Sequence, residues 1–331
     1  MMAVVNTRYG PPEVLELTRV PVPAPGPGQV LVRVEAVALN PADKFLVLGR
    51  PTLVRLMIGL RRPSASNRVR GQDLAGTVVA VGAGVTRLTA GERVFGSASG
   101  ALAEYACDKQ HVFAAIPAGL SFEQAAAIPM AGLAALHALR DAARLSAGAH
   151  LLVNGAAGGI GTFAIQIAKG LGAEVTGVCS TRNVDLVREL GADHVIDYTE
   201  RPVTASERRY DVILDNVGNH RLGELRRLLT PTGTLVTNSG EVGPDGGPIV
   251  RILKAMLHSM TGSQTVRTFT SAPNVADLET LASMAEAGTI RPVIDKVYPL
   301  ERAAEAMAHV ASRHARGKVV VRVAPDDAAR T

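Results

Sequence analysis

Hydrophobic positions in the first 120 residues occur in short alternating or apolar runs, separated by residues that favour turns. Runs of this kind indicate β-strands, and the Gly and Pro clusters between them indicate the turns that join strands. The runs lie at residues 29–37, 75–81, 93–95, 101–107 and 112–116. The segment 47–70 breaks this rhythm, and only a partly helical insertion is predicted there. We therefore expect a β-rich unit in the N-terminal part of the chain.

The period of the pattern changes at Ser121. Ser121 and Gln124 match a capping box, and the Ala-rich stretch that follows to residue 144 predicts helix. Beyond it, strand-like segments alternate with helix-like segments. The strands are expected at 151–153, 175–179, 195–196, 212–214 and 234–237, and the helices at 162–170, 184–190 and 220–229. Such alternation is typical of an α/β fold with a parallel, doubly wound sheet.

The last third of the chain is expected to add mainly helices. A loop rich in Gly and Pro is predicted at 240–248, and helices are predicted at 249–260, 274–287 and 300–312. A strand at 318–323 follows, and the tail after residue 324 is predicted to be disordered.

A glycine-rich turn joins the first strand and helix of the alternating region. Residues 154–161 read Asn-Gly-Ala-Ala-Gly-Gly-Ile-Gly, and a second apolar strand follows at 175–179. Glycines allow the backbone to approach a pyrophosphate, whose charge is then stabilised at the helix N-terminus. An ordinary turn between a strand and a helix can also be rich in glycine. The order strand, turn, helix, strand nevertheless favours a nicotinamide nucleotide site.

The residues after the second strand indicate which nucleotide is bound. An NAD site has Asp or Glu there, which accepts a hydrogen bond from the ribose 2′-hydroxyl and repels a 2′-phosphate. This chain has Ser180, Arg182 and Asn183 instead, and no carboxylate before Asp185. Because arginine offers a charged fork of donors to a phosphate, NADPH is favoured. Ser180 and Asn183 could also cap the following helix, and the two roles are compatible.

Composition limits the classes of binding partner and the cellular compartment that we expect. The length of 331 residues suits two domains, and 29 Arg with 6 Lys contribute to a net charge of +5. Basic residues occur at 55–70 without aromatic neighbours, which favours a solvated face over a nucleic-acid site. Two cysteines, Cys107 and Cys179, exclude a disulfide framework. Since no signal peptide is evident and the apolar stretch 125–139 is too short to span a bilayer, a cytoplasmic protein with no membrane partner is expected.

Nine short motifs give the chain a likeness to a known family through their order and spacing. They lie at residues 40–43 (Asn-Pro-Ala-Asp), 71–76, 91–96, 101–105, 126–129, 154–161, 191–198, 215–218 and 317–320. Over essentially its whole length the chain resembles the medium-chain dehydrogenase/reductase superfamily, and within it the zinc-independent quinone oxidoreductase branch. The resemblance implies a discontinuous GroES-like catalytic domain at 1–122 and 266–331, a Rossmann NADPH-binding domain at 123–265, and a homodimer.

Two departures from the zinc-dependent relatives bear on the chemistry. Those relatives carry a catalytic Cys near position 40 and Gly-His-Glu where this chain has Gly71-Gln72-Asp73. Asn40 and Gln72 cannot replace a thiolate and an imidazole as zinc ligands, and the cysteine loop of a structural zinc site is absent from the sequence. No catalytic metal is therefore expected.

The resemblance also assigns the catalytic end of the site. It places Asn40 beside the nicotinamide, as the best candidate donor to the substrate oxygen, with Asp43, Gln72 and Asp73 nearby. Asn40 can equally begin a turn with Pro41, and Asp73 can equally accept from the backbone of the turn at 70–75.

Two further departures concern proton transfer. Phe45 stands where many quinone reductases have Tyr, and Ala134 stands where a Thr is common. Phe can neither donate a proton nor a hydrogen bond. No residue is a convincing general acid, so protonation from water is expected.

The cofactor-binding residues implied by the resemblance fall into three groups. They are Gly155, Ala157, Gly158, Gly159 and Ile160 at the pyrophosphate, Ser180, Arg182, Asn183 and Tyr198 at the 2′-phosphate, and Asn216, Val217 and Lys318 towards the nicotinamide. Ala156 takes the place of the first fingerprint glycine. Tyr198 could instead be an aromatic at the edge of the core, and Lys318 a surface charge.

Without a metal ion to activate a simple carbonyl, the expected reaction is hydride transfer to a carbon that is already conjugated with a carbonyl. The leading hypothesis is an NADPH-dependent reductase of a small-molecule quinone or enone. The second is an enoyl-thioester reductase acting on a carrier-bound or CoA-bound chain. A carrier would need a basic face, which could be formed by Arg55, Arg61, Arg62, Arg68 and Arg70. A third is an NADPH-binding protein without turnover, because fold and cofactor do not prove catalysis. A zinc alcohol dehydrogenase is the least favoured.

Overall fold

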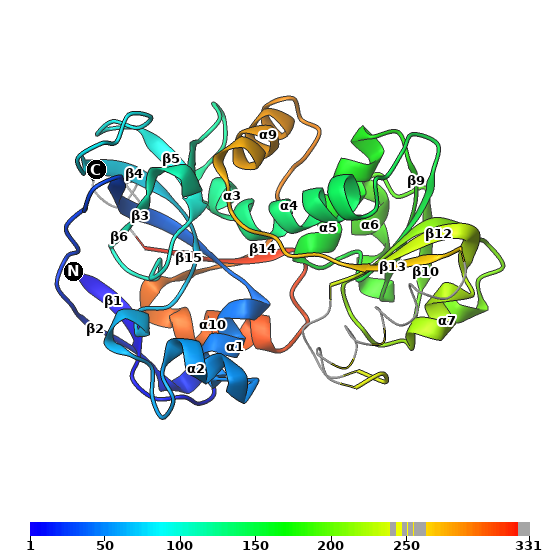
Figure 1. Cartoon of the computed structure of the whole chain (residues 1–331), viewed down its shortest axis with the longest axis horizontal. Helices are drawn as coiled ribbons and strands as arrows, with labels where there is room; N and C mark the ends of the chain where they lie inside the picture. Colours follow the sequence, from blue (N-terminus) through cyan, green and yellow to red (C-terminus); the bar gives the residue numbers. More distant parts are fainter. Residues whose placement is uncertain (239–242, 247–249, 251–253, 255–262, 324–331) are drawn as a thin grey trace. The chain divides into compact units, whose positions relative to one another are not determined.

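The computed structural model describes residues 1–238, 243–246, 250, 254 and 263–323 (Figure 1). Contacts divide the chain into two compact units. Unit 1 comprises Met1–Met130, Pro273–Gly288 and Pro292–Thr331, and unit 2 comprises Ala131–Ala272 and Thr289–Arg291. The two ends of the chain therefore fold together, and the middle of the chain forms a unit of its own.

Unit 1 is built on a mainly antiparallel sheet. Its strands in the described part of the chain run in the order β14-β15-β3-β4-β5-β7, and β6 also pairs with β3. Their bounds are β3 (Gln29–Leu39), β4 (Asp73–Val81), β5 (Arg93–Ser97), β6 (Tyr105–Lys109), β7 (Phe113–Ala115), β14 (Ile294–Pro299) and β15 (Lys318–Arg322). Strands β1 (Met2–Asn6) and β2 (Leu15–Arg19) form a separate antiparallel pair. Val30, Val32 and Val34 alternate along β3, so they share one face of the sheet and are buried in its core.

Helices cover the sheet of unit 1 and the ends of its strands. They are α1 (Pro41–Leu48), α2 (Arg55–Ile58), α3 (Phe122–Ala126), α9 (Val275–Glu286) and α10 (Ala303–Ala311), with 3-10 turns at Pro12–Val14, Thr52–Val54, Ala65–Asn67, Gln110–Val112 and Leu300–Arg302. The capping box expected at Ser121 is confirmed. Its hydroxyl accepts from the Gln124 backbone N–H at 3.2 Å, and the Gln124 side chain accepts from the Ser121 N–H at 3.0 Å. None of the described helices is both long enough and apolar enough to cross a bilayer.

Unit 2 contains a parallel sheet with the strand order β10-β9-β8-β11-β12-β13. The strands are β8 (His150–Asn154), β9 (Glu174–Cys179), β10 (His194–Asp197), β11 (Tyr210–Asp215), β12 (Leu229–Thr237) and β13 (Thr265–Thr268). The helices are α4 (Pro129–Leu136), which begins in unit 1, a π-helix (His137–Ala142), α5 (Gly159–Gly170), α6 (Val184–Glu189) and α7 (Leu222–Arg226), with 3-10 turns at Thr181–Asn183 and Val203–Ala205. This arrangement confirms the expected doubly wound α/β fold.

The strand order reverses between β8 and β11, which are hydrogen-bonded neighbours. Ligands of such sheets bind at the carboxyl ends of the strands, at the point where the order reverses. In unit 2 this point lies just after Asn154 and Asp215, which are paired in register. A ligand of unit 2 is therefore expected at the turns that begin at residues 155 and 216.

Several elements differ from the pattern-based expectations. Strands β2, β13 and β14 were not predicted. Apolar residues are few in β13 and β14, and in β14 only Tyr298 is buried. Strand β6 begins at Tyr105 rather than residue 101. The helix expected at 220–229 ends at Arg226, because the backbone enters β12 at Leu229. Most of the loop expected at 240–248 and of the helix at 249–260, and the tail after 324, lie outside the described residues.

Candidate functional site

The glycine turn after β8 can be built only with glycine at two of its positions. Gly155 has a φ of +81°, in the left-handed region that side chains rarely adopt. Gly161 is packed so closely against the turn that a Cβ there would lie 2.2 Å from the Gly155 carbonyl oxygen. The buried Ala156 replaces the first glycine of the fingerprint without opening the turn. The chain is thus folded tightly back before the helix begins.

Helix α5 starts directly at this turn and provides an anion-binding N-terminus. Gly158 is its N-cap, with φ −80° and ψ 173°, and its own N–H donates to the Gly155 carbonyl at 3.1 Å. The first N–H groups of a helix, here from Gly159 and Ile160 onward, have no acceptor within the helix. Ala157 is buried, whereas Gly158, Gly159 and Ile160 are partly exposed. The turn can therefore present backbone donors and the positive end of a helix dipole to a pyrophosphate.

Two buried polar side chains hold the neighbouring strand ends together. Asn154 donates through Nδ2 to Asp215 Oδ1 at 2.8 Å and to Asn219 Oδ1 at 2.9 Å. Asp215 Oδ1 also accepts from the N–H groups of Val217 (3.3 Å) and Gly218 (3.0 Å). The sequence pattern did not predict a role for Asn154 or Asp215. Both directly follow apolar strand runs, and this position at a strand end could have marked them as candidate site residues.

The turn after β11 brings Asn216 and Val217 beside the glycine turn. A Cβ on Gly155 would lie 2.8 Å from Val217 Cγ2, so the two turns pack closely. Asn216 Nδ2 is buried and lacks a hydrogen-bond partner, and Val217 is 40 % exposed. An unpaired buried donor is costly unless a ligand completes it. The carboxamide oxygen of a nicotinamide is an acceptor of the kind this donor needs.

The residues expected at the 2′-phosphate gather at the end of β9. Asn183 Nδ2 donates to Ser180 Oγ at 3.2 Å, and Asn183 Oδ1 is buried without a partner. Ser180 and Asn183 occupy the N-cap positions of the 3-10 turn Thr181–Asn183 and of α6, but neither side chain makes a capping hydrogen bond there. Arg182 is exposed beside them. This group has the donors that a phosphate ester requires.

Tyr198 and Asp197 follow on the adjacent strand end. Tyr198 is 58 % exposed, so it is not an aromatic at the edge of the core. Asp197 is the carboxylate that strand pairing brings opposite Cys179. Its Oδ1 accepts from the N–H and hydroxyl of Thr199 at 2.9 and 2.7 Å. Asp197 therefore already accepts hydrogen bonds from its own turn.

In unit 1 the predicted catalytic residues form one buried polar cluster. Asn40, Asp73 and Lys318 come from the end of β3 and the starts of β4 and β15, which are adjacent strands. Asp73 Oδ2 accepts from Asn40 Nδ2 at 2.9 Å, from the Met130 N–H at 3.1 Å, and from Lys318 Nζ at 3.5 Å. Lys318 Nζ also donates to Asn40 Oδ1. All three side chains are at most 3 % exposed.

These contacts bear on three alternatives weighed from the sequence. Lys318 is not a surface charge, because it pairs with Asp73 in the interior. Asp73 accepts from Asn40, from Lys318 and from the backbone N–H of Met130, which lies outside the turn at 70–75. Asn40 does begin a helix, as the N-cap of α1, and its N–H donates to Asp43 Oδ2 at 2.8 Å. Its side-chain amide is held on both sides, by Asp73 and by Lys318.

Burial dominates the electrostatics of this cluster. It raises the pKa of Asp43 to about 7, and the nearby Asp73 adds to the rise, while the Asn40 N–H and Lys318 oppose it. Burial also raises the pKa of Asp73, against the opposite pull of Lys318 and Asn40. The pKa of Lys318 is lowered by burial, although Asp73 and Asp43 oppose the change. Asp43 can therefore hold a proton up to near-neutral pH.

Asp43 should make folding stability depend on pH between about 4 and 7. Its folded-state pKa lies above the unfolded value, so the folded state binds the extra proton. That contribution is fully present below the unfolded pKa and is lost as pH rises through about 7. We expect Asp43→Asn to flatten this part of the profile of unfolding free energy, measured by urea titration at several pH values. A variant whose profile overlays that of the wild type would contradict the assignment.

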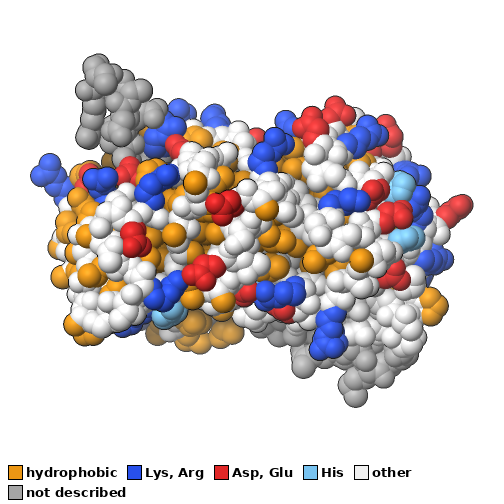
Figure 2. All heavy atoms as spheres, turned by 90° about the horizontal axis from the view of Figure 1, so that it is seen from above, with side chains coloured by type: hydrophobic (Ala, Val, Ile, Leu, Met, Phe, Trp, Pro, Cys, Tyr) orange, Lys and Arg blue, Asp and Glu red, His pale blue; other side chains and the backbone are white. Residues whose placement is uncertain are grey.

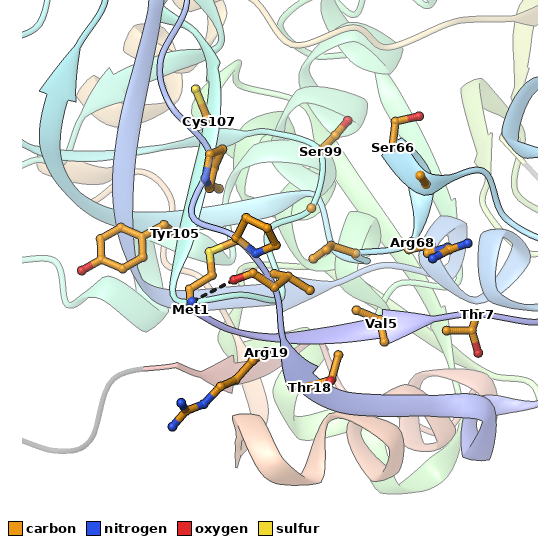
Figure 3. Close-up of a pocket in the computed structure, with 17 residues that line it drawn as sticks. Met1, Val5, Thr7, Thr18, Arg19, Ser66, Arg68, Ser99, Tyr105 and Cys107 are labelled. Atoms are coloured by element: carbon orange, nitrogen blue, oxygen red, sulfur yellow. Dashed lines mark hydrogen bonds between the residues drawn. The ribbon is translucent and has the colours of Figure 1, made fainter.

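A separate pocket of about 520 Å³ opens in unit 1 (Figure 3). Met1, Thr18, Arg68, Tyr105 and Cys107 are among its lining residues, and none of the predicted site residues lines it. Burial and Asp108 raise the pKa of the Cys107 thiol, which therefore stays protonated at neutral pH. This pocket offers no reactive group for the expected chemistry.

Comparisons with known proteins agree with the likeness seen in the motifs. A family model for the alcohol dehydrogenase GroES-like domain matches residues 26–138, and one described as zinc-binding dehydrogenase matches residues 190–321. The chain is 31 % identical to a chloroplast envelope quinone oxidoreductase homolog of Arabidopsis thaliana, over 96 % of each chain. It is 33 % identical to an NADPH-dependent alkenal/one oxidoreductase of the same plant (97 % of this chain, 79 % of the relative). It is 35 % identical to the trans-enoyl reductase pgmF of Aspergillus terreus (89 % and 86 %).

Solved structures show the same fold. The quinone oxidoreductase from Coxiella burnetii matches with a TM-score of 0.85 and 30 % identity, over 98 % of this chain and 99 % of that chain. The Escherichia coli quinone oxidoreductase complexed with NADPH matches with a TM-score of 0.83 and 26 % identity, over 98 % and 100 %.

Proposed function

The chain belongs to the medium-chain dehydrogenase/reductase superfamily, and we propose that it is a zinc-independent, NADPH-dependent reductase of quinones and α,β-unsaturated carbonyl compounds. Units 1 and 2 correspond in this proposal to the catalytic domain expected at 1–122 and 266–331 and to the NADPH-binding domain expected at 123–265. A homodimer is part of the proposal and rests on the family resemblance. A cytoplasmic location is also part of it, because the free thiols of Cys107 and Cys179 suit a reducing compartment.

One observation carries the proposal. Five buried side-chain atoms in the described residues lack a hydrogen-bond partner, and four of them belong to predicted site residues. They are Asp43 Oδ1, Asp73 Oδ1, Asn183 Oδ1 and Asn216 Nδ2. Buried polar atoms of this kind are rare in folded proteins and are usually completed by a ligand or water. Two of these atoms lie in each unit. In unit 2 an acceptor on the nicotinamide could complete Asn216 Nδ2, and in unit 1 a donor on a substrate or a water could complete the Asp43 and Asp73 oxygens.

The donor set in unit 2 fits NADPH. The α5 N-terminus would hold the pyrophosphate, Ser180, Arg182, Asn183 and Tyr198 would hold the 2′-phosphate, and Asn216 and Val217 would meet the nicotinamide side. A nicotinamide held there would supply the hydride for reduction of a carbon conjugated with a carbonyl group. A proton from water completes the reduced product.

The cluster in unit 1 does not fit a catalytic zinc ion. Two carboxyl groups lie next to Asn40. Asp73 is already paired with the Lys318 ammonium, and Asp43 accepts from the Asn40 N–H and holds a proton up to near-neutral pH. A fixed positive charge at this point repels a dication, and an amide oxygen is a poor zinc ligand. We therefore propose that charge on the substrate oxygen is stabilised by hydrogen bonding from the Asn40 amide and not by a metal ion.

Of the predicted catalytic residues Asn40, Asp43 and Asp73, Asn40 is proposed to contact the substrate, and Asp43 and Asp73 to act through it. Asn40 Nδ2 donates to Asp73 and also faces the Ala38 carbonyl at 3.5 Å, so its orientation is fixed before a substrate arrives. Lys318 and Asp73 act on Asn40 and are in this sense positioning residues. Asp43 accepts a hydrogen bond from the N–H of Asn40 and thereby fixes the start of α1.

Arg182 should decide the choice between NADPH and NADH. Loss of a charged hydrogen bond to the 2′-phosphate costs about 1.5–3 kcal/mol, so we expect Arg182→Ala to raise the KM for NADPH about tenfold or more. The KM for NADH should change little, because NADH has no 2′-phosphate. Arg188→Ala is the matched control, since Arg188 is exposed on α6 and bonded only loosely to Asp185 at 3.8 Å. Equal effects of the two variants on both cofactors would contradict the assignment.

A substrate panel distinguishes the three candidate activities. NADPH oxidation is followed with a 1,4-quinone, a short enone and a crotonyl thioester. Turnover of the quinone or enone supports the proposal. Turnover of the thioester alone favours the enoyl-thioester activity, for which the likeness to a trans-enoyl reductase is the supporting observation. Tight NADPH binding without turnover of any of them would favour a protein that binds the nucleotide and is not an enzyme.

A further inference from the structure

A short helical turn in unit 1 presents an apolar face to solvent. Leu53, Leu56 and Met57 have the spacing i, i+3, i+4 of one helix face across the 3-10 turn Thr52–Val54 and α2, and Leu60 follows just after Gly59, where the helix ends. They are 60, 66, 83 and 66 % exposed. They account for four of the large exposed apolar side chains in the described part of the chain, gathered within eight residues. We call these four residues the apolar stripe.

The other side of the same turn is fastened to unit 1. Ile58 is 8 % exposed, and the hydroxyl of Tyr9 donates to the Gly59 carbonyl at 2.5 Å. The guanidinium of Arg55 lies over the Tyr9 ring at 4.6 Å, and its Nε donates to the Gly49 carbonyl at 2.9 Å. The turn is therefore held in place while the apolar stripe projects outward. Figure 1 shows α2 near α1 in this unit.

The stripe lies in a segment with basic and no acidic residues. Between Asp43 and Asp73 the sequence has one Lys and six Arg and no Asp or Glu. Arg50, Arg61 and Arg62 are exposed next to the stripe. On the face drawn in Figure 2, in contrast, blue and red side chains are interleaved. Arg70 does not contribute to this surface, because it is 4 % exposed and donates to Asn6 Oδ1 from both Nε (3.0 Å) and Nη2 (2.7 Å).

We infer that the apolar stripe and its flanking arginines dock unit 1 on a lipid surface that carries anionic headgroups. Apolar side chains on one turn can enter the boundary between headgroups and acyl chains, while guanidinium groups beside them meet lipid phosphates. Each arginine near an anionic surface strengthens binding by about fivefold. This inference reverses the earlier expectation of no membrane partner.

Two other occupants fit the surface less well. An acidic carrier protein would match the arginines, but it would not account for four exposed apolar side chains within eight residues. A second copy of this chain, related by a two-fold axis, would place Arg61 and Arg62 near their own equivalents, and like charges repel.

The test is sedimentation of the full-length protein with vesicles. One set contains phosphatidylcholine with phosphatidylglycerol, and the other contains phosphatidylcholine alone. We expect binding to the anionic set, weakened by salt, and little binding to the neutral set. Leu56→Ser with Met57→Ser, and separately Arg61→Glu with Arg62→Glu, should each lower the partition constant about tenfold or more.

Matched controls remove equivalent groups elsewhere. Val22→Ser with Val81→Ser removes two apolar side chains that are 48 and 42 % exposed, and Arg201→Glu with Arg227→Glu reverses two exposed charges in unit 2. Both controls should bind as the wild type does. No binding to anionic vesicles, or equal loss in test and control variants, would overturn the inference. A change in solution mass on Leu56→Ser with Met57→Ser, with no vesicle binding by the wild type, would show an interface between copies and also overturn it.

Discussion

Replacing Gly161 with alanine is expected to abolish tight NADPH binding. The added Cβ would lie 2.2 Å from the Gly155 carbonyl oxygen and 2.7 Å from the Ala156 carbonyl carbon. Because these are backbone atoms, the turn itself must move, and the donors at the start of α5 move with it. Losing two N–H contacts to a charged pyrophosphate at about 1.5–3 kcal/mol each weakens binding about 100-fold or more. Fluorescence titration of NADPH would measure the change.

Gly223→Ala is the control for this substitution. Gly223 also lies in a helix, α7 of the same unit, and a Cβ there meets nothing within 4 Å. It should leave NADPH affinity unchanged and keep or slightly raise stability, since alanine favours helix. If Gly161→Ala bound NADPH as tightly as Gly223→Ala, the pyrophosphate would not lie at this turn.

Replacing Lys318 with methionine is expected to destabilise unit 1 strongly. The change leaves Asp73 buried without its cation, which typically costs about 3–5 kcal/mol. Without Lys318 the folded-state pKa of Asp73 rises further, so its folded form favours the proton. The loss should therefore be smaller at pH 5 than at pH 8. Urea unfolding at both pH values measures it.

Two further variants make the Lys318 result specific. Lys169→Met removes a lysine that pairs with Asp193 at 2.8 Å on a partly exposed surface, and should cost less than about 1 kcal/mol. Lys318→Met combined with Asp73→Asn removes both charges and should recover part of the stability. If the double variant is as unstable as Lys318→Met alone at pH 8, the pairing is not the source of the effect.

The nucleotide-binding region could be predicted well because its signals are local. Residues 154–161 combine a strand end, a turn and a helix start within eight positions, and the structure places Gly155 and Gly161 where no side chain fits. The alternation of strands and helices likewise indicated the parallel sheet. The helix at 220–229 was predicted too long because residues 227–229 fit the helical pattern, whereas Leu228 accepts a backbone hydrogen bond from Tyr210 and Leu229 pairs with Tyr210 of β11.

The catalytic cluster could be anticipated only in part. Asn40 and Asp73 were identified through the family resemblance, but the burial of Lys318 depends on a partner 278 positions away in the chain. Periodicity reports which face of a strand a residue occupies, and it does not report which strand lies beside it. For the same reason the paired roles of Asn154 and Asp215 were missed, although each ends an apolar strand.

The central claim is that NADPH-dependent reduction proceeds here without a catalytic metal ion. The most direct test is to treat the protein with a strong zinc chelator, verify by elemental analysis that zinc is absent, and measure NADPH oxidation with a 1,4-quinone. We predict the same kcat as for the untreated protein. Loss of turnover on zinc removal, with recovery when zinc is restored, would contradict the account.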